Sequence, residues 1–241
     1  MSSHTILGTS FDDNLDGSSN NIFSDFDADE ILGFDGNDEL TGLAGDDTLK
    51  GGAGEDTLNG DGNSSFFSSE FLSSDDFIEG NSGDDDLEGG SGFDTLLGGS
   101  GDDYISGGNA NDNLQGGTGD DLIFGGSGDD RLEGYQSNPS SFGQYDTLNG
   151  GSGEDNFILG NFTESFYEDN GFATIVQFEG SEDKIQLHGD ASEYSVNTVS
   201  YYGNQSESDF EISYQGNLIG VLRDPSTSFS ELISEDFSFV G

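Results

Sequence analysis

The chain contains no cysteine and no tryptophan, and only four of its 241 residues are lysine or arginine. Without cysteine it can form neither a disulfide framework nor a thiolate metal site. Its 50 acidic residues leave a formal net charge of −46. Nucleic acid and anionic membrane surfaces repel such a polyanion, so neither is expected as a partner.

Long apolar runs are missing as well. No stretch approaches the ~20 apolar residues that a membrane span requires. The first ten residues lack the cationic and apolar regions of a cleaved signal peptide. We therefore expect neither a membrane span nor a cleaved signal, and an exported chain would carry its export signal elsewhere.

High negative charge with few hydrophobic residues is typical of disordered chains. Three features favour a folded protein instead: 20 Phe and 8 Tyr residues, leucines that recur at a fixed interval, and 40 glycines in register with them. A disordered chain has no need of a period, so these features indicate a repeat architecture.

The repeat is nine residues long. Residues 80–133 hold six copies without a gap, from GNSGDDDLE to GGSGDDRLE, and residues 24–59 hold four. Four further copies begin at positions 8, 71, 141 and 150. The sixth position is aspartate in all fourteen copies: Asp13, Asp29, Asp38, Asp47, Asp56, Asp76, Asp85, Asp94, Asp103, Asp112, Asp121, Asp130, Asp146 and Asp155.

Two other positions of the nonapeptide are nearly constant. The eighth is Leu or Ile in thirteen copies and Phe157 in the last. The fourth is glycine in nine copies, and the departures are Phe11, Asp27, Ser74, Ala110 and Gln144. Glycines tolerate positive φ and allow a tight turn, while the triplet around the aliphatic residue predicts a very short strand with that side chain turned inward.

Two nonapeptides therefore predict one turn of a flattened solenoid, with strand and glycine-rich turn alternating. Stacked turns place each sixth-position aspartate beside the one eighteen residues further on, for example Asp85 beside Asp103 and Asp94 beside Asp112.

This pattern resembles the RTX, or haemolysin-type, calcium-binding repeat G-G-x-G-x-D-x-U-x. The resemblance covers about residues 8–158 and implies an all-β fold, a right-handed parallel β-roll. In that family, aspartate carboxylates and turn carbonyls hold Ca²⁺ between successive turns. Carried over, the ligands are the fourteen sixth-position aspartates and the main-chain oxygens of Gly80, Gly89, Gly98, Gly107, Gly116 and Gly125.

Oxygen-only ligation suits a hard cation, and flexible glycine turns favour Ca²⁺ over Mg²⁺. One ion per stacked pair of copies sets a ceiling of about twelve ions, or about five to seven if the interruptions break the stack. Stacked carboxylates ~5 Å apart repel by about 3 kcal/mol at an effective dielectric constant of ~20. We therefore expect a roll that is largely unfolded without calcium and folds cooperatively with it.

The pattern divides the chain into a lead-in (1–7), the roll (8–158) and a C-terminal β capping and secretion domain (159–241). Three segments interrupt the nine-residue period: 17–23, 60–70 and 134–140. We expect surface loops there, which solenoids tolerate on one face. The alternative is a binding loop that displays Phe66 and Phe67, or Tyr135.

Beyond residue 158 the glycine period gives way to alternation of apolar and polar residues, which predicts a small domain of antiparallel strands that caps the solenoid. The predicted strands are 173–178, 184–187, 210–214 and 218–222.

This segment resembles the part that follows RTX repeats in bacterial, notably cyanobacterial-type, exoproteins; Thr174–Gly189 and Leu218–Val221 carry the likeness. Residues 235–241 resemble the uncleaved C-terminal signal of type I secretion substrates, with a last edge strand as the alternative. The resemblance implies an extracellular or cell-surface protein that engages the type I secretion machinery.

No catalytic motif is present. The two histidines are His4, expected in a flexible terminus, and His188, expected beside a turn, and no nucleophile elbow, metalloprotease helix or phosphate-binding loop occurs. We expect a non-enzymatic calcium-binding protein. The alternatives are an adhesive or structural cell-surface module with a cell-surface or polysaccharide partner, and the export half of a secreted enzyme.

Overall fold

The computed structural model describes residues 4–11, 13–16, 28–43, 45–61, 74–135, 143–160, 166–167, 171–180, 182–199, 209–223 and 236–240. Within these ranges the fold is all-β, and the one helical element is a single 3₁₀ turn, η1 (Ala191–Glu193). None of the described residues forms a helix of the length and apolarity needed to cross a membrane.

The strands form two sheets. The first sheet contains, in spatial order, β1 (His4–Leu7), β3 (Asp29–Asp35), β5 (Thr48–Ala53), β7 (Phe77–Ser82), β9 (Thr95–Ser100), β11 (Asn113–Thr118), β13 (Arg131–Tyr135), β15 (Asn156–Ile158), β17 (Lys184–His188) and β21 (Phe237–Val240). The second contains β18 (Tyr194–Val199), β19 (Asp209–Tyr214), β20 (Asn217–Arg223), β16 (Ala173–Val176), β14 (Thr147–Ser152), β12 (Leu122–Ser127), β10 (Tyr104–Asn109), β8 (Asp86–Ser91), β6 (Thr57–Asn59), β4 (Glu39–Thr41) and β2 (Asn14–Asp16).

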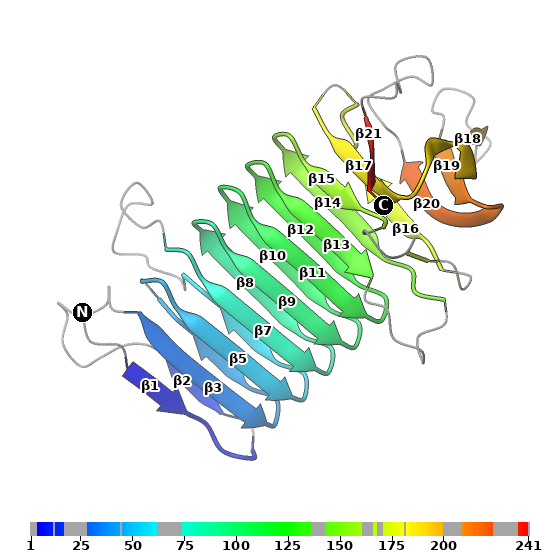
Figure 1. Ribbon diagram of the computed structural model, residues 1–241. Helices are drawn as coiled ribbons and strands as arrows, with labels where there is room; N and C mark the ends of the chain where they lie inside the picture. Colours follow the sequence, from blue (N-terminus) through cyan, green and yellow to red (C-terminus); the bar gives the residue numbers. More distant parts are fainter. Residues whose placement is uncertain are drawn as a thin grey trace.

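From β1 to β17 successive strands alternate between the two sheets, and each strand from β1 to β15 pairs in parallel with the strand two further along the chain. Ile105 of β10 is in register with Leu87 of β8 and with Ile123 of β12, eighteen residues away on either side. Figure 1 shows the resulting stack of turns, with the N-terminus at one end and β16 to β21 at the other. The predicted parallel β-roll is confirmed.

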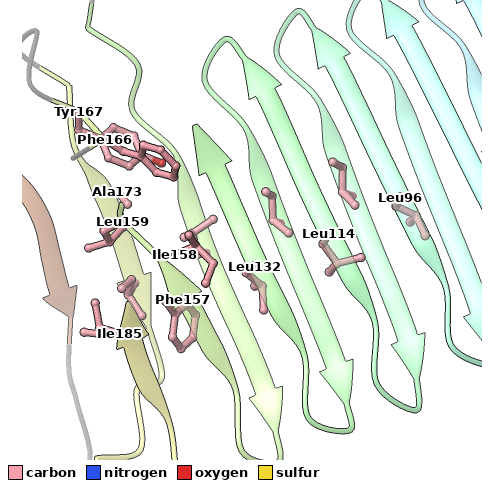
Figure 2. Close-up of a cluster of buried hydrophobic side chains, with 14 of the residues drawn as sticks. Leu96, Leu114, Leu132, Phe157, Ile158, Leu159, Phe166, Tyr167, Ala173 and Ile185 are labelled. Carbon is pink, nitrogen blue, oxygen red and sulfur yellow. The ribbon is translucent and has the colours of Figure 1, made fainter. Parts of the chain in front are cut away.

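The core is a row of aliphatic side chains between the sheets, because each short strand turns its eighth-position residue inward. These side chains are fully buried from Ile31 to Phe157, and Figure 2 shows part of the row, including Leu96, Leu114 and Leu132. At the C-terminal end the core widens with Ile158, Leu159, Phe166, Tyr167 and Phe178. At the N-terminal end Ile6 and Leu15 are only partly buried.

The roll continues beyond residue 158, which corrects the expectation of an entirely antiparallel C-terminal domain. β16 pairs in parallel with β14, and β17 pairs in parallel with β15. The physical reason is the same inward pattern as in the repeats, since Ile175 is in register with Leu148 and Ile185 with Phe157. Alternation of apolar and polar residues does not reveal the direction of a strand's partner.

The antiparallel cap is present in part. β18 pairs antiparallel with β19 and β19 antiparallel with β20, so the expected strands 210–214 and 218–222 form a hairpin around Gln215 and Gly216. β20 also pairs in parallel with β16. This joins the hairpin to the second sheet and covers the edge that the last turn would otherwise expose.

The lead-in belongs to the first sheet. Residues 4–7 form β1 and pair in parallel with β3, so the expectation of a flexible terminus at His4 is wrong. His188 is the last residue of β17, and its carbonyl accepts the Tyr194 hydroxyl at 2.7 Å.

Of the predicted loops, 17–23 lies outside the described residues, as do Phe66 and Phe67. Gly60 and Asp61 are described, and Gly134 and Tyr135 complete β13 rather than leave it.

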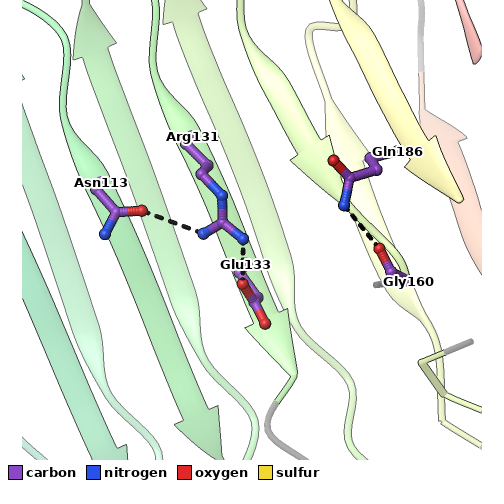
Figure 3. A network of polar contacts seen from close by, with 5 residues as sticks. All are labelled: Asn113, Arg131, Glu133, Gly160 and Gln186. Carbon is purple, nitrogen blue, oxygen red and sulfur yellow. Dashed lines mark hydrogen bonds and ion pairs between the residues drawn. The ribbon is translucent and has the colours of Figure 1, made fainter. Parts of the chain in front are cut away.

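Polar contacts lie on the outer face of the first sheet, both within a strand and between neighbouring parts of the chain. The Arg131 guanidinium donates to Asn113 Oδ1 at 3.1 Å and to Glu133 Oε2 at 2.6 Å, and Gln186 donates to the carbonyl of Gly160 at 2.9 Å, as Figure 3 shows. These partly buried pairs stabilise the sheet only modestly, so the core between the sheets carries more of the packing energy.

Substitutions of the adjacent residues Leu96 and Leu97 compare the contributions of the inner and outer faces of β9 to stability. Leu96 is fully buried, whereas Leu97 points outward and is half-buried. Leu96→Ala is expected to lower the free energy of unfolding by about 2–5 kcal/mol, and Leu97→Ala by about 1 kcal/mol or less. Urea unfolding of both variants in saturating calcium measures the difference, and equal losses would contradict the inward assignment.

Candidate metal sites in the turns

The sixth-position aspartates form two ladders, one along each edge of the roll. In each ladder the backbone N–H of one aspartate donates to Oδ1 of the aspartate in the next turn, at 2.7–3.1 Å. The first ladder precedes strands of the first sheet: Asp29, Asp47, Asp76, Asp94, Asp112, Asp130, Asp155 and Asp183. The second precedes strands of the second sheet: Asp13, Asp38, Asp56, Asp85, Asp103, Asp121 and Asp146.

All fourteen aspartates predicted from the sequence lie in these ladders, and the neighbours expected eighteen residues apart, such as Asp85 and Asp103, are hydrogen-bonded. Asp183 is a member that the nonapeptide count missed. Its signal is the triplet Asp183-Lys184-Ile185, which repeats the aspartate, variable residue and aliphatic residue of positions six to eight.

The second carboxylate oxygen of the interior aspartates is buried without a hydrogen-bond donor. Native proteins rarely leave a buried polar atom unsatisfied, so each such oxygen calls for an unseen partner such as an ion. Within the described ranges this holds for Oδ2 of Asp47, Asp56, Asp76, Asp85, Asp94, Asp103, Asp112, Asp121, Asp130 and Asp155.

A glycine carbonyl of the next turn faces the same place. A Cβ on Gly98 would have both Asp103 Oδ2 and the carbonyl oxygen of Gly116 within 3.0 Å. Only glycine leaves room for this approach of a carboxylate to a backbone oxygen. The carbonyls of Gly89, Gly98, Gly107, Gly116 and Gly125 all lie beside an aspartate Oδ2 in this way.

The same geometry adds carbonyls that sequence analysis did not include, those of Gly33, Gly51, Gly60 and Gly150. Sequence analysis included Gly80 for its carbonyl; a Cβ on Gly80 would collide with Asp85 Oδ2.

Two of the interruptions fall inside a turn rather than between copies. A Cβ on Gly60 would collide with Asp76 Oδ2, and one on Gly134 would collide with Asp146 Oδ2. In uninterrupted copies the first-position glycine makes this contact with the aspartate five residues later. Gly60 and Gly134 therefore act as first-position glycines although the chain is longer between them and their aspartates.

A third set of side chains also links successive turns, but here the backbone N–H of the later turn donates to a side chain of the earlier turn. At the fifth position, Asp84 Oδ1 accepts the backbone N–H of Asp102, and Asp102 Oδ1 accepts that of Asp120. Asn111 makes the same bond to the N–H of Asp129 at 2.8 Å. A neutral amide therefore suffices at this exposed position, in contrast to the invariant carboxylate beside it.

Burial makes the ionised form of the ladder carboxyls unfavourable. Loss of hydration is the largest cause, and it raises the pKa of Asp76, Asp112 and Asp121 to about 8. The pKa is raised to about 7 for Asp47, Asp85, Asp94 and Asp103, and to about 6 for Asp130, Asp146, Asp155 and Asp183. Bonds from the backbone N–H groups oppose these shifts without cancelling them.

The two basic side chains of the repeats, Lys50 and Arg131, pair with glutamates and not with the ladder aspartates. Lys50 pairs with Glu79 at 2.7 Å and Arg131 with Glu133 at 2.6 Å, both on the outer face of the first sheet. Lys184 lies 3.9 Å from Asp236, next to β21. A cation between the turns would supply the missing positive charge.

The donor set fits Ca²⁺. It consists of oxygen atoms alone, carboxylates and backbone carbonyls on glycine turns, which a hard cation with flexible coordination prefers. Among the residues that the structure describes, no three acidic or histidine side chains converge on one point. An ion in these turns would therefore draw most of its ligands from carbonyl oxygens.

The sequence model of the RTX calcium-binding nonapeptide repeat matches residues 32–66, 73–96, 79–114, 106–138 and 143–162, which together span just over half of the chain. No curated protein matches the sequence. Both ladders and both sheets run through the matched residues. The chain belongs to the family of RTX calcium-binding repeat proteins.

Proposed function

We propose that this protein is a secreted, non-enzymatic calcium-binding protein that folds when Ca²⁺ fills the turns of its roll. The observation that carries the proposal is the buried Oδ2 of the interior ladder aspartates. A glycine carbonyl of the next turn lies beside it at Asp47, Asp76, Asp85, Asp94, Asp103, Asp112 and Asp130.

The ligands in this proposal are the interior aspartates of both ladders and the first-position glycine carbonyls beside them. Bound calcium supplies positive charge between stacked carboxylates. The protein's own contribution is to order those oxygens through the N–H to Oδ1 bonds of the ladders, and to keep side chains out of the turn by placing glycine there.

Calcium binding and folding are coupled in this proposal because the two ladders bring carboxylates together only in the folded roll. Without the ion, ionised ladder carboxylates destabilise the folded roll, and the raised pKa values of Asp76 and Asp121 reflect this. With the ion, its binding free energy adds to the free energy of folding. A chain exported unfolded at low calcium would fold outside the cell, where calcium is high.

Titrating calcium into chelator-treated protein tests the proposal. We expect a cooperative gain of far-UV circular dichroism strand signal at ~10⁻⁴–10⁻³ M Ca²⁺, the range of extracellular modules. Mg²⁺ and monovalent salt at matched ionic strength serve as controls. An equal response to those salts, or a full strand signal in chelator, would contradict calcium-driven folding.

Adjacent aspartates provide a matched pair of variants. Asp103→Asn keeps Oδ1 for the N–H of Asp85 but removes the charge of the buried carboxylate. It is expected to lower the free energy of unfolding at fixed calcium by about 1–3 kcal/mol.

Asp102→Asn is the control, because Asn111 already fills the same position in another turn. It is expected to leave the calcium midpoint unchanged or slightly lower, since it removes repulsion. Chemical unfolding at several calcium concentrations compares the two, and indistinguishable variants would count against the sixth-position site.

Acidification should partly replace calcium. The folded pKa of about 6–8 lies above the ordinary value of 3.8, so protonation favours the folded roll. That stabilisation is complete below about pH 4 and is lost as pH rises towards 8. In chelator, the thermal midpoint and the strand signal are expected to rise as the pH falls from 8 to 5. Calcium-saturated protein is the control, and a calcium-free roll that weakens on acidification would refute the assignment.

A further inference from the structure

The turn that holds Asp146 differs from the interior turns. The Tyr167 hydroxyl donates to Asp146 Oδ2 at 2.5 Å. The same hydroxyl lies 2.5 Å from the point that a Cβ on Gly134 would occupy. In the turn of Asp103, the corresponding place beside Gly98 is taken by the carbonyl oxygen of Gly116. A neutral O–H donor therefore satisfies the oxygen that is left unsatisfied in the turns before it.

A second neutral donor lies in the same turn. Gln144 replaces the usual fourth-position glycine, and its side-chain amide donates to the carbonyls of Gly117 and Gly119 at 3.0 and 3.2 Å. Gln144 is 5% exposed. Its N–H groups thus engage turn carbonyls of the stacked copy 116–124, at the second and fourth positions, directly after the first-position Gly116.

Packing holds Tyr167 in this unusual position. Its side chain is 1% exposed, and its ring centroid lies 5.2 Å from that of Tyr135. Its φ of 62° is in the left-handed region, which a tyrosine adopts only when its surroundings enforce it. The hydroxyl is therefore directed at Asp146 by the fold and is not a passing surface contact.

At two other ladder ends, protein groups also donate hydrogen bonds to the Oδ2 of the terminal aspartate. Asp13 Oδ2 accepts the backbone N–H of Thr9 at 2.6 Å and its hydroxyl at 2.9 Å. Asp183 Oδ2 accepts the backbone N–H of Glu179 at 2.8 Å. Protein donors thus hold these terminal carboxylates, whereas Oδ2 of interior aspartates such as Asp85, Asp103 and Asp121 lacks a donor.

We propose that Gln144 and Tyr167 take the place of calcium at the last turn of the second ladder, so that Asp146 binds no ion. Tyr167 supplies an O–H donor to the carboxylate oxygen that a cation satisfies in the interior turns, and Gln144 supplies N–H donors to two carbonyls of the stacked turn. The inference rests on the proposed calcium sites and separates Asp146 from the interior aspartates of its ladder.

Counting the bound ions tests this assignment. Wild type, Asp146→Asn and Asp103→Asn are dialysed to equilibrium in saturating calcium, and bound calcium per chain is measured by atomic emission. Both substitutions keep Oδ1 for the ladder bond, from Asp121 and from Asp85 respectively. We expect Asp146→Asn to bind as many ions as wild type and Asp103→Asn to lose at least one.

Loss of an ion from Asp146→Asn equal to that from Asp103→Asn would overturn the inference while leaving the calcium function intact. A wild type that binds no calcium would overturn the proposed function itself. Circular dichroism in saturating calcium checks that each variant is folded. If Asp146→Asn does not fold, Tyr167→Phe keeps the carboxylate: an ion count at or above wild type supports the replacement, and a lower count contradicts it.

Discussion

Repulsion between carboxylates stacked in successive turns is the constraint on which the rest of this roll depends. The ladders bring acidic groups of one edge into hydrogen-bonded succession, as with Asp85, Asp103 and Asp121. The two basic residues of the repeats, Lys50 and Arg131, pair instead with Glu79 and Glu133 on the outer face of the first sheet. The basic residues of the repeats therefore leave the stacked aspartates in the turns without a positive partner.

The remaining features of the nonapeptide follow from this constraint. Glycine at the first position allows a carboxylate oxygen and a carbonyl oxygen to share one small space, as at Gly98. The single aliphatic residue, such as Leu114, fills a core only one side chain thick from each sheet. So thin a core buries little apolar area per residue, and packing alone therefore offsets less of the conformational entropy lost on folding.

The sequence predicted the elements that obey the period and missed those that break it. Fixed spacing was enough to predict the inward row, the parallel stack and the ladder neighbours, because in a solenoid one repeat determines the next. The parallel direction of β16 and β17 was not predictable from alternation, because it depends on which strand lies next to Ile175 and Ile185. The reach of Tyr167 to Asp146 across twenty-one residues depends on a left-handed backbone that no local pattern indicates. The fifth-position ladder was obscured by copies that carry Phe93 or Tyr145 there instead of Asp or Asn.

The contact between Gly60 and Asp76 has a consequence for how such a molecule can be enlarged. Register in this roll is kept by what meets inside a turn, and the number of residues between the two partners is free to vary. Closing a longer connection costs little more than closing a short one, since the entropic penalty grows only with the logarithm of its length. The turn is therefore an attachment point, and Gly60 and Gly134 mark two of them, on opposite edges of the roll. Peptides grafted at such points would be held on a regular scaffold, at separations set by multiples of the ~4.8 Å spacing between neighbouring strands.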